Sequence, residues 1–459
     1  MNKRSFDAII IGSGQAGTPL AFKMAGMGHK VAFIERQHFG GSCINTGCTP
    51  TKTYVASART MWEAGRAAGM GVVLPEGARI DLKKVKQRKD ALTASMARGI
   101  EQGLREHPNI SLFTGEAAFA GHKCVKVDEH RLQAAQIFIN VGARPHVPEA
   151  FRKLSFLTNE SILALEELPG HLIIIGGSYV GLEFGQIFRR FGSRVSIIEN
   201  MDSIVAHEDR EISDLIHTFL HQEGIDLYTG ADCVEAGMEE DGRIGVSVSC
   251  HDGETRVTGS HLLVAVGRKP NTDTLNLDAT GLKAGKKGFI EVDEYLETGV
   301  KGIYALGDCN GRGAFTHTSY NDYEIVSGNL FNGQNRKVTD RIPTYCLYTD
   351  PPLGRAGMTK KEALAKGHHV LEAKIPMKDV NRAREKDETH GMMQLIIDAG
   401  SEKILGGAIL GTGGDEIISG IVNAMAAGTP YPVLRDAVIP HPTVAELIPS
   451  MLGSLSKPD

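Results

Sequence analysis

Cysteine is scarce in this chain, and so are aromatic residues and long hydrophobic runs. Seven cysteines among 459 residues are too few for a disulfide-stabilised secreted domain, so a close cysteine pair is expected to be catalytic or metal-binding. The longest apolar runs resemble AIII and LIII, far short of the ~20 residues that a membrane helix requires. The basic start leads into a strand pattern and not into a signal-peptide cleavage site. We therefore expect a cytoplasmic protein without a membrane segment.

An excess of charge of one sign is also missing. Lys and Arg number 50 and Asp and Glu number 55, for a net charge of −5, and no basic tract stands out. This argues against binding to nucleic acid or to an anionic membrane. Glycine, by contrast, is abundant at 54 residues, well above the usual ~7%, and it is typical of tight turns and phosphate-binding loops. At roughly 100–200 residues per domain, the chain is long enough for about three domains around a small-molecule site.

The N-terminal segment carries a complete dinucleotide-binding fingerprint. A strand is predicted over Phe6–Ile11, followed by a loop with Gly12, Gly14 and Gly17, a helical stretch, and a second strand that ends at Glu35. The first glycine makes the tight turn, the middle one lets the backbone approach a pyrophosphate at the helix N-terminus, and the last lets the helix pack on the strand. The carboxylate would bind ribose hydroxyls. We expect a dinucleotide here, against the alternative of a glycine turn that binds nothing.

A second copy of the same unit lies in the middle of the chain. The strand Leu172–Ile175 leads into a loop with Gly176, Ser178 and Gly181, a helical stretch, and a strand ending at Glu199. The acidic residue follows the first glycine of the loop by 23 positions in both copies. A serine stands at the middle position, so a pyrophosphate would sit slightly differently there. Two such sites in one chain suggest a relay between two cofactors.

The second acidic residue bears on the choice of nucleotide. Glu199 is followed by Asn200 and Met201 and not by arginines, and a carboxylate repels the 2′-phosphate of NADPH. The second site is therefore expected to prefer NADH. Two alternatives stay open: Arg194 or Arg210 folds back toward the site, or the carboxylate only caps a strand.

Two cysteines follow the first fingerprint closely. Cys43 and Cys48 are five positions apart and would not share one face of a regular helix, but Gly47 permits a distorted turn that brings them within disulfide range. Pro50 fits the first turn of a helix, whose N-terminus would favour the thiolate of Cys48. So short a loop makes a purely stabilising disulfide a poor explanation. The pattern predicts a redox pair, with metal ligation or inert thiols as alternatives.

The segment GGSCINTGCTPTK resembles the active-site segment of the flavoprotein disulfide reductases, among them dihydrolipoamide dehydrogenase, glutathione reductase and mercuric reductase, and the resemblance extends over essentially the whole chain. It implies that Cys43 is the interchange thiol that meets the substrate and that Cys48 is the charge-transfer thiol against the flavin. It also implies that Lys52 lies by the flavin N5 and pairs with Glu183. Without the resemblance, Lys52 would be read as a solvated helix lysine.

Further motifs of the same family follow in order. Gly142 and Gly267 lie in segments that resemble the two crossings between the FAD-binding and NAD-binding domains. Asp308 ends a segment that resembles the second FAD motif, which implies a hydrogen bond to the ribityl chain; the alternative is a buried aspartate that caps a turn. The resemblance places His317 in a helix aimed at the flavin pyrimidine, where the dipole would stabilise negative charge. Tyr179 occupies the position of a gate over the nicotinamide pocket.

The C-terminal part, from about Arg341, resembles the interface domain that forms the family's homodimer. Near its end stand His441 and Glu446, which fit an imidazole held by a carboxylate, as a base for thiol-disulfide exchange requires. The rival interpretation is a capping box formed by Thr443 and Glu446. The family ending favours the dyad, with His441 serving the cysteine pair of the partner subunit.

Together these features predict an α/β fold with two Rossmann-like dinucleotide-binding domains, for FAD and NAD, and an α+β C-terminal dimerisation domain. The FAD-binding domain is expected to be discontinuous, with the NAD-binding domain inserted and the interface domain last. The expected boundaries are residues 1–145 and 265–340, 146–264, and 341–459.

The expected function is an FAD-dependent NADH:disulfide oxidoreductase acting on a small disulfide or a lipoyl substrate, or in reverse on a dithiol. The stretches NRAREKDETHG and AGTPYPVLRDAVIPHPTVAE resemble the branch with mercuric reductase and the copper-reducing flavoproteins, so reduction of Cu(II) or Hg(II) is the enzymatic alternative. A flavin-containing protein that only sequesters metal is the non-enzymatic one. No resident metal site is expected, since His217 and His221 have the spacing of a zinc pair but no third ligand in their context.

Overall fold

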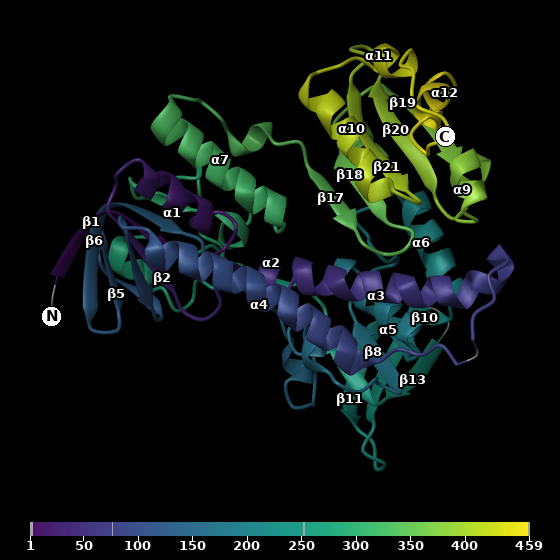
Figure 1. Cartoon of the computed structure of the whole chain (residues 1–459), viewed down its shortest axis with the longest axis horizontal. Helices are drawn as coiled ribbons and strands as arrows, with labels where there is room; N and C mark the ends of the chain where they lie inside the picture. Colours follow the sequence, from purple (N-terminus) through teal and green to yellow (C-terminus); the bar gives the residue numbers. More distant parts are fainter. Residues whose placement is uncertain (1–2, 76, 251–252, 458–459) are drawn as a thin grey trace.

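The computed structural model describes residues 3–75, 77–250 and 253–457. The molecule has three parts, each built on one main sheet: a mostly parallel sheet, a parallel sheet and a five-stranded antiparallel sheet, and two long helices cross between the parts (Figure 1). Within these residues, no helix is long and apolar enough to cross a membrane.

The first sheet has seven strands, in the order β3-β2-β1-β6-β5-β4, with β16 paired to the end of β6. Strands β1, β2, β3, β6 and β16 run parallel, whereas β4 and β5 form antiparallel pairs. Their bounds are β1 Lys3–Ile11, β2 Val31–Glu35, β3 Ile110–Thr114, β4 Ala117–Gly121, β5 Cys124–Val127, β6 His130–Ile139 and β16 Ile303–Ala305. The sheet thus joins segments more than 160 residues apart in sequence.

The second parallel sheet has the order β10-β9-β8-β14. After their first residue, the strands β8 and β14 are continuous buried apolar runs, as expected for a parallel sheet with both faces covered. The bounds are β8 His171–Ile175, β9 Arg194–Ile198, β10 Ile225–Tyr228 and β14 His261–Val264. A three-stranded antiparallel sheet of β11 Asp232–Met238, β12 Ile244–Cys250 and β13 Gly253–Gly259 lies beside it, and β7 Ala143–Pro145 pairs with β15 Arg268–Pro270 where the chain passes between the two parallel sheets.

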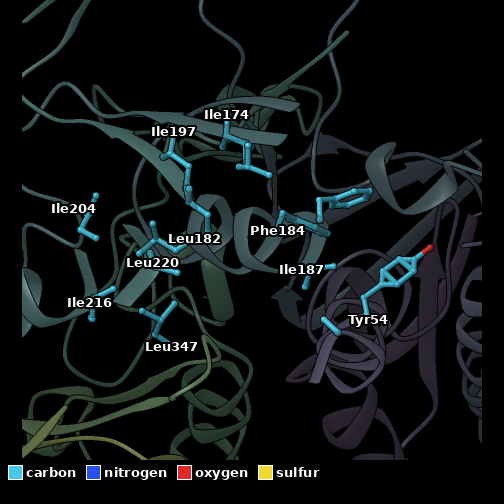
Figure 2. Packing of buried hydrophobic residues seen from close by; sticks show 14 of the residues in the cluster. Tyr54, Ile174, Leu182, Phe184, Ile187, Ile197, Ile204, Ile216, Leu220 and Leu347 are labelled. Carbon is cyan, nitrogen blue, oxygen red and sulfur yellow. The ribbon is translucent and has the colours of Figure 1, made fainter. Parts of the chain in front are cut away.

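Helix α5 (Tyr179–Phe191) shows why the second unit folds as predicted. It follows the second glycine loop, is buried around most of its circumference, with Leu182, Ile187 and Phe191 among its buried residues, and ends at Gly192, whose φ of 113° favours glycine. Figure 2 shows Leu182 and Phe184 of this helix near Ile174 and Ile197 of the sheet, with Tyr54 of α3 (Cys48–Arg66) on the far side of the helix. The core of the second unit therefore extends onto the helix that begins at a predicted redox cysteine.

The remaining helices flank the sheets. Their bounds are α1 Gly17–Gly26, α2 Gly41–Asn45, α4 Leu82–Glu106, α6 Arg210–Gln222, α7 Thr316–Asn332, α8 Lys360–Ala365, α9 Asn381–Glu385, α10 Gly414–Ala426, α11 Tyr431–Arg435 and α12 Leu447–Leu452. The Asp81 side chain caps α4 by accepting a hydrogen bond from Lys84 N at 3.1 Å. Helices α3 and α4 pack on each other across the middle of the molecule (Figure 1).

The C-terminal unit is a five-stranded antiparallel sheet in the order β17-β18-β21-β20-β19. Its strands are β17 Thr344–Leu347, β18 Leu353–Gly357, β19 Val370–Pro376, β20 Met392–Asp398 and β21 Ile404–Leu410. Helix α10 packs on β18 and β21. The predicted fold class, two Rossmann-like units followed by an α+β unit, is confirmed.

Candidate active site

One cavity of about 1740 Å³ contains most of the residues singled out in the sequence. This volume exceeds the 300–1,000 Å³ of a usual small-ligand pocket, as two dinucleotides would require. The predicted residues that line it are Gly12, Gly14, Glu35, Cys43, Cys48, Lys52, Gly142, Gly176, Ser178, Tyr179, Glu183, Glu199, Gly267, Asp308 and His317. Gly17 and Gly181 instead lie at helix starts beneath the loops, and neither His441 nor Glu446 is among the lining residues.

The first glycine loop is closely packed against the end of β6. A Cβ at Gly14 would lie 2.6 Å from Asn140 Oδ1, so only glycine fits there. The Glu35 carboxylate accepts hydrogen bonds from Ser13 N at 2.8 Å and Gln37 N at 2.9 Å. Asn140 Oδ1 in turn accepts a hydrogen bond from Gly17 N at 2.9 Å. The helix N-terminus and the fixed carboxylate fit the pyrophosphate and ribose of a dinucleotide.

The second glycine loop repeats this geometry with fewer ties. Glu199 accepts hydrogen bonds from Gly177 N at 2.6 Å and Met201 N at 2.9 Å. Neither Arg194 nor Arg210 turns toward the carboxylate: the first pairs with Asp226 at 3.0 Å and the second with Asp214 at 2.8 Å. The arginine alternative for this loop is therefore not realised. This loop and the Glu199 carboxylate also fit the pyrophosphate and ribose of a dinucleotide.

The cysteine pair lies between the two loops. Helix α2 ends at Asn45 and α3 begins at Cys48, and the break at Thr46 and Gly47 brings the two thiols together, both free. Cys48 Sγ also lies 3.1 Å from Thr316 Oγ1. The hydrogen bond from the Cys43 thiol lowers the pKa of Cys48 to about 6, with further help from Thr316 and the charge of Lys52. The same hydrogen bond and burial raise the pKa of Cys43, so one thiol is a ready thiolate and the other needs a base.

A charged pair joins the two units beside these thiols. Lys52 Nζ on α3 donates a hydrogen bond to Glu183 Oε2 on α5 at 2.7 Å, and the Glu183 side chain is only 6% exposed. The other oxygen of Glu183 accepts a hydrogen bond from Tyr348 N at 3.0 Å. The Tyr348 ring faces the Lys52 ammonium at 4.6 Å, a cation–π contact. Lys52 is therefore a fixed cation in the cavity and not a solvated helix lysine.

Two predicted residues lie near the end of the first unit. Asp308 follows β16 and pairs with Arg268, and burial raises the pKa of its carboxyl group. His317 lies in the first turn of α7, and its Nε2 is 2.7 Å from Thr344 O. Because a carbonyl can only accept, Nε2 carries the proton. Asp308 and His317, which lie far along the chain, thus line the same cavity as the first glycine loop.

The C-terminal residues His441 and Glu446 form the predicted contact with each other, but they lie outside the cavity. His441 Nδ1 is 2.8 Å from Glu446 Oε2, while 70% of the His441 side chain is exposed. Thr443 Oγ1 donates its hydrogen bond to Pro440 O at 2.8 Å and α12 begins only at Leu447. The rival capping box is therefore not formed. The chain does not bring this imidazole to its own cysteine pair.

Sequence reasoning missed several contributors to the site. Thr316, Asn140 and Arg268 stood inside motifs that were identified, but no signal in the sequence marked their contacts. Tyr345, which lines the cavity, stood in the segment that resembles the interface domain, and no role was predicted for it. Among the described residues, no group of three or more His, Cys, Asp or Glu side chains is placed to hold a metal ion. The His217 and His221 rings stack on α6 at 6.2 Å.

The chain matches two family models over most of its length. Residues 6–322 match the family described as pyridine nucleotide-disulphide oxidoreductase, and residues 343–452 match the dimerisation domain of that family. The chain is 34% identical to the "Probable pyridine nucleotide-disulfide oxidoreductase RclA" of Escherichia coli (strain K12), over 97% of this chain and 98% of that protein.

Two further relatives carry different activities. The chain is 32% identical to a mercuric reductase of Staphylococcus aureus, over 96% of this chain and 81% of that protein, and 31% identical to a dihydrolipoyl dehydrogenase of Thermus scotoductus, over 99% and 98%. The solved Cu(II) complex of the HOCl-induced flavoprotein disulfide reductase RclA from Escherichia coli has a TM-score of 0.88 and 33% identity, covering 99% of both chains.

Proposed function

Because the chain belongs to the pyridine nucleotide-disulphide oxidoreductase family, we propose that it reduces a disulfide substrate with NADH, using Cys43 and Cys48 as its redox pair. The chain is an enzyme, a flavoprotein that uses FAD and NAD(P)H, and its dimerisation domain makes it a homodimer. The alternative of a scaffold that only sequesters metal is therefore not retained. The observation that carries the proposal is the free thiol pair beside Lys52 and Glu183, between two dinucleotide loops in one cavity.

The two loops have separate tasks in this proposal. The first, with Gly12, Gly14, Gly17 and Glu35, would hold FAD, and the second, with Glu199, would hold NADH. Bound FAD would supply a two-electron relay between the nicotinamide and the cysteine pair. The first sheet, which pairs β16 with β6, supports assigning residues 1–145 and 265–340 to FAD binding. Residues 146–264 would bind NADH and residues 341–459 would form the dimer interface.

Further residues are assigned to each ligand. Lys52, Gly142, Asp308 and His317 would complete the FAD site. The loop glycines Gly176 and Gly181 with Ser178, together with Tyr179 and Gly267, would complete the NADH site. The Glu199 carboxylate, which accepts hydrogen bonds from two backbone N–H groups, supports a preference for NADH over NADPH. The 2′-phosphate of NADPH would bring a second negative charge against it.

The cysteines divide the chemistry on the substrate. The Cys43 thiol loses its proton and attacks one sulfur of the substrate disulfide, forming a mixed disulfide and releasing the first substrate thiolate. The Cys48 thiolate then attacks the Cys43 sulfur, which closes the Cys43–Cys48 disulfide and releases the second thiolate. The raised pKa of Cys43 means that the first step needs a base.

The histidine dyad can provide that base from the other subunit. His441 is exposed and its Nδ1 is paired with Glu446, which leaves Nε2 free to take a proton from Cys43 and to return it to the leaving thiolate. Since the dyad lies outside its own chain's cavity, we assign it to the cavity of the partner subunit. A shared active site of this kind requires the homodimer.

The test is a Cys43→Ser variant of the FAD-loaded enzyme, assayed with NADH and either lipoamide or glutathione disulfide. Disulfide turnover is expected to fall at least 1,000-fold, while anaerobic bleaching of the flavin by NADH persists. Cys124→Ser, at a half-buried thiol on β5 outside the cavity, is the matched control and should keep full turnover. Undiminished disulfide turnover in Cys43→Ser would rule out the proposed pair.

Reduction of a soft metal ion is the second candidate, favoured by the similarity to the Cu(II) complex of RclA and to mercuric reductase. The ion would be a substrate at the thiol pair, whose sulfurs suit Cu(II) or Hg(II). His441→Ala separates the two candidates in NADH oxidation assays. Disulfide turnover should collapse in this variant, whereas metal-driven turnover that survives it would establish the metal reductase.

A further inference from the structure

Strand β17 of the C-terminal unit lies where all three units meet. Thr344 O accepts a hydrogen bond from His317 of the first unit at 2.7 Å. The Tyr345 hydroxyl donates to Glu208, which belongs to the loop before α6 in the second unit. Tyr345 also lines the cavity. A single strand outside both dinucleotide-binding units therefore contacts each of them at the cavity.

Glu208 is held by a buried cation from the next strand. Its side chain is 0% exposed, and that of Arg355 on β18 is 1% exposed. Arg355 Nε donates to Glu208 Oε2 at 2.9 Å, and the neighbouring Asp209 accepts hydrogen bonds from Lys360 N at 2.9 Å and Lys361 N at 3.1 Å. A buried carboxylate is tolerated only with such partners. The loop of the second unit is therefore anchored to the C-terminal unit.

The Tyr345 ring connects this anchor to the predicted gate. Its centroid lies 5.4 Å from that of Tyr179, with the rings at 68°. Phe315 stacks on Tyr345 at 5.7 Å and 12° and meets Tyr179 edge-on at 5.7 Å. Such edge-to-face and stacked contacts favour one ring orientation over others. With its hydroxyl fixed by Glu208, the Tyr345 ring is a rigid support for Tyr179.

The anchored loop also touches the second glycine loop directly. Val205 has a φ of 41°, unusual for a β-branched residue, and its N–H donates to Gly177 O at 2.9 Å. The next two residues, Ala206 and His207, line the cavity. The loop that carries Glu208 thus forms part of the wall beside the proposed nucleotide site.

We propose that Glu208, clamped by Arg355, is a positioning residue for nicotinamide binding: through the Tyr345 hydroxyl it holds Tyr179 over the pocket, so that the dimerisation domain sets the affinity for NADH. This inference rests on the proposed assignment of the second loop to NADH. It concerns binding of the nucleotide and not the chemistry of the cysteines. Neither Glu208 nor Arg355 lines the cavity, so neither acts by touching the nucleotide.

The test is Tyr345→Phe in the FAD-loaded enzyme, because this change removes only the hydroxyl and keeps the ring. Substituting Arg355 would leave a buried, uncompensated carboxylate and destabilise the fold. The dissociation constant for NAD+ by titration calorimetry and the KM for NADH in anaerobic flavin reduction are both expected to rise about tenfold. The rate at saturating NADH should change less than twofold, since no reacting group is lost.

The same substitution is then made in a Tyr179→Ala background. If the Tyr345 hydroxyl acts through Tyr179, the change Tyr345→Phe in the Tyr179→Ala variant should alter the NAD+ affinity less than twofold. Substitutions of residues in contact have non-additive effects. Tyr54→Phe is the matched control: its buried hydroxyl donates to Leu163 O at 3.3 Å and lies outside the cavity. It should leave the NAD+ affinity within twofold of the wild type.

Three results would overturn the inference. They are an unchanged NAD+ affinity in Tyr345→Phe, an equal loss in both backgrounds, and an equal loss in Tyr54→Phe. Binding of NAD+ involves no cysteine, so a failure of the proposed disulfide reaction, seen with Cys43→Ser, leaves this test standing. A wild-type holoenzyme that bound no NAD+ would remove both the assignment of the second loop and this inference.

Discussion

The two glycine loops share a backbone plan and differ in how they are closed. In both, the carbonyl of one residue lies against the first glycine: Asn140 against Gly12 and Ala265 against Gly176. Asn140 adds a carboxamide that accepts from Gly17 N and donates to Leu306 O at 2.8 Å. Ala265 has no polar side chain and adds no such tie.

The difference matches the two kinds of ligand. The first loop is fastened to a distant segment of its own unit through the carboxamide of Asn140, a residue that is only 5% exposed. The second loop has no such carboxamide, and its ties are the half-buried Glu199 carboxylate and the backbone N–H of Val205. A loop closed on both sides suits a resident cofactor, and an open loop suits a nucleotide that enters and leaves in every cycle. In our proposal, the enclosure of the loop, more than the fingerprint itself, distinguishes the site of the resident cofactor from that of the nucleotide substrate.

The largest expected effect comes from adding a methyl group beneath each loop. A Cβ at Gly17 would lie 2.3 Å from Gly12 O, and one at Gly181 would lie 1.9 Å from Gly176 O. Gly17→Ala should purify without flavin, with the 450 nm to 280 nm absorbance ratio lowered at least tenfold. Gly181→Ala should keep its flavin and bind NAD+ at least 100-fold more weakly. Gly26→Ala in α1, where the added methyl group would meet open space, is the control and should change neither flavin content nor NAD+ affinity. Loss of flavin from Gly181→Ala would contradict the division of the two ligands between the two loops.

A second substitution makes the first loop resemble the second. Asn140→Ala leaves Gly17 N and Leu306 O without their partner in a buried place, at about 1–3 kcal/mol for each group. The FAD dissociation constant should rise about 10- to 100-fold, measured from the fluorescence of released flavin, while NAD+ affinity changes less than twofold. Flavin held as tightly as in the wild type would show that the carboxamide is not what closes the loop.

The proposed preference for NADH over NADPH rests on Glu199. Glu199→Ala removes the ribose partner and the charge that opposes a 2′-phosphate, so the ratio of kcat/KM for NADH over NADPH should fall about tenfold or more, as expected for a hydrogen bond to a charged group. Flavin content should stay unchanged, because Glu35 serves the other loop. An unchanged ratio in steady-state assays would mean that Glu199 serves only the strand end.

The smallest effect concerns the Cys48 thiolate between the loops. One charged residue from each unit shifts the pKa of this thiol, and the two shifts have opposite signs. Lys52 from the first unit lowers the pKa of Cys48, and Glu183 from the second raises it. Alkylation of Cys48 should fall about tenfold between pH 7 and pH 5, because the thiolate forms only above a pKa of about 6. Lys52→Met should move the midpoint up and Glu183→Gln should move it down. Shifts of the same sign in peptide mass spectrometry would contradict this balance.

Local signals were enough to predict the two fingerprints and the cysteine turn. Strand, glycines and acidic residue recur at one spacing, and β1 and β8 begin within three residues of the predicted positions. The break between α2 and α3 lies at the glycine that the sequence singled out. These features depend on near neighbours in the chain, so a sequence pattern records them.

Contacts between distant segments left no such pattern. Glu208 and Arg355 are 147 positions apart, and a buried ion pair looks in sequence like two ordinary surface charges. Local sequence favoured the capping box for Glu446 and only the family resemblance favoured the histidine dyad; in the structure α12 begins at Leu447 and Glu446 contacts His441. Asn140 likewise gains its meaning only when Leu306 lies beside it.

The pairing of β16 with β6 has a consequence for synthesis on the ribosome. Strand β6 ends at Ile139, but its partner begins only at Ile303, so the flavin site lacks one wall while the whole intervening unit is made. At roughly 5–20 residues per second, translation of that stretch takes on the order of ten to thirty seconds. The inserted unit can fold during this interval, whereas the proposed flavin site is completed only after β16 has been made. With FAD in the proposed site, we therefore expect flavin to be needed late in the biogenesis of this enzyme.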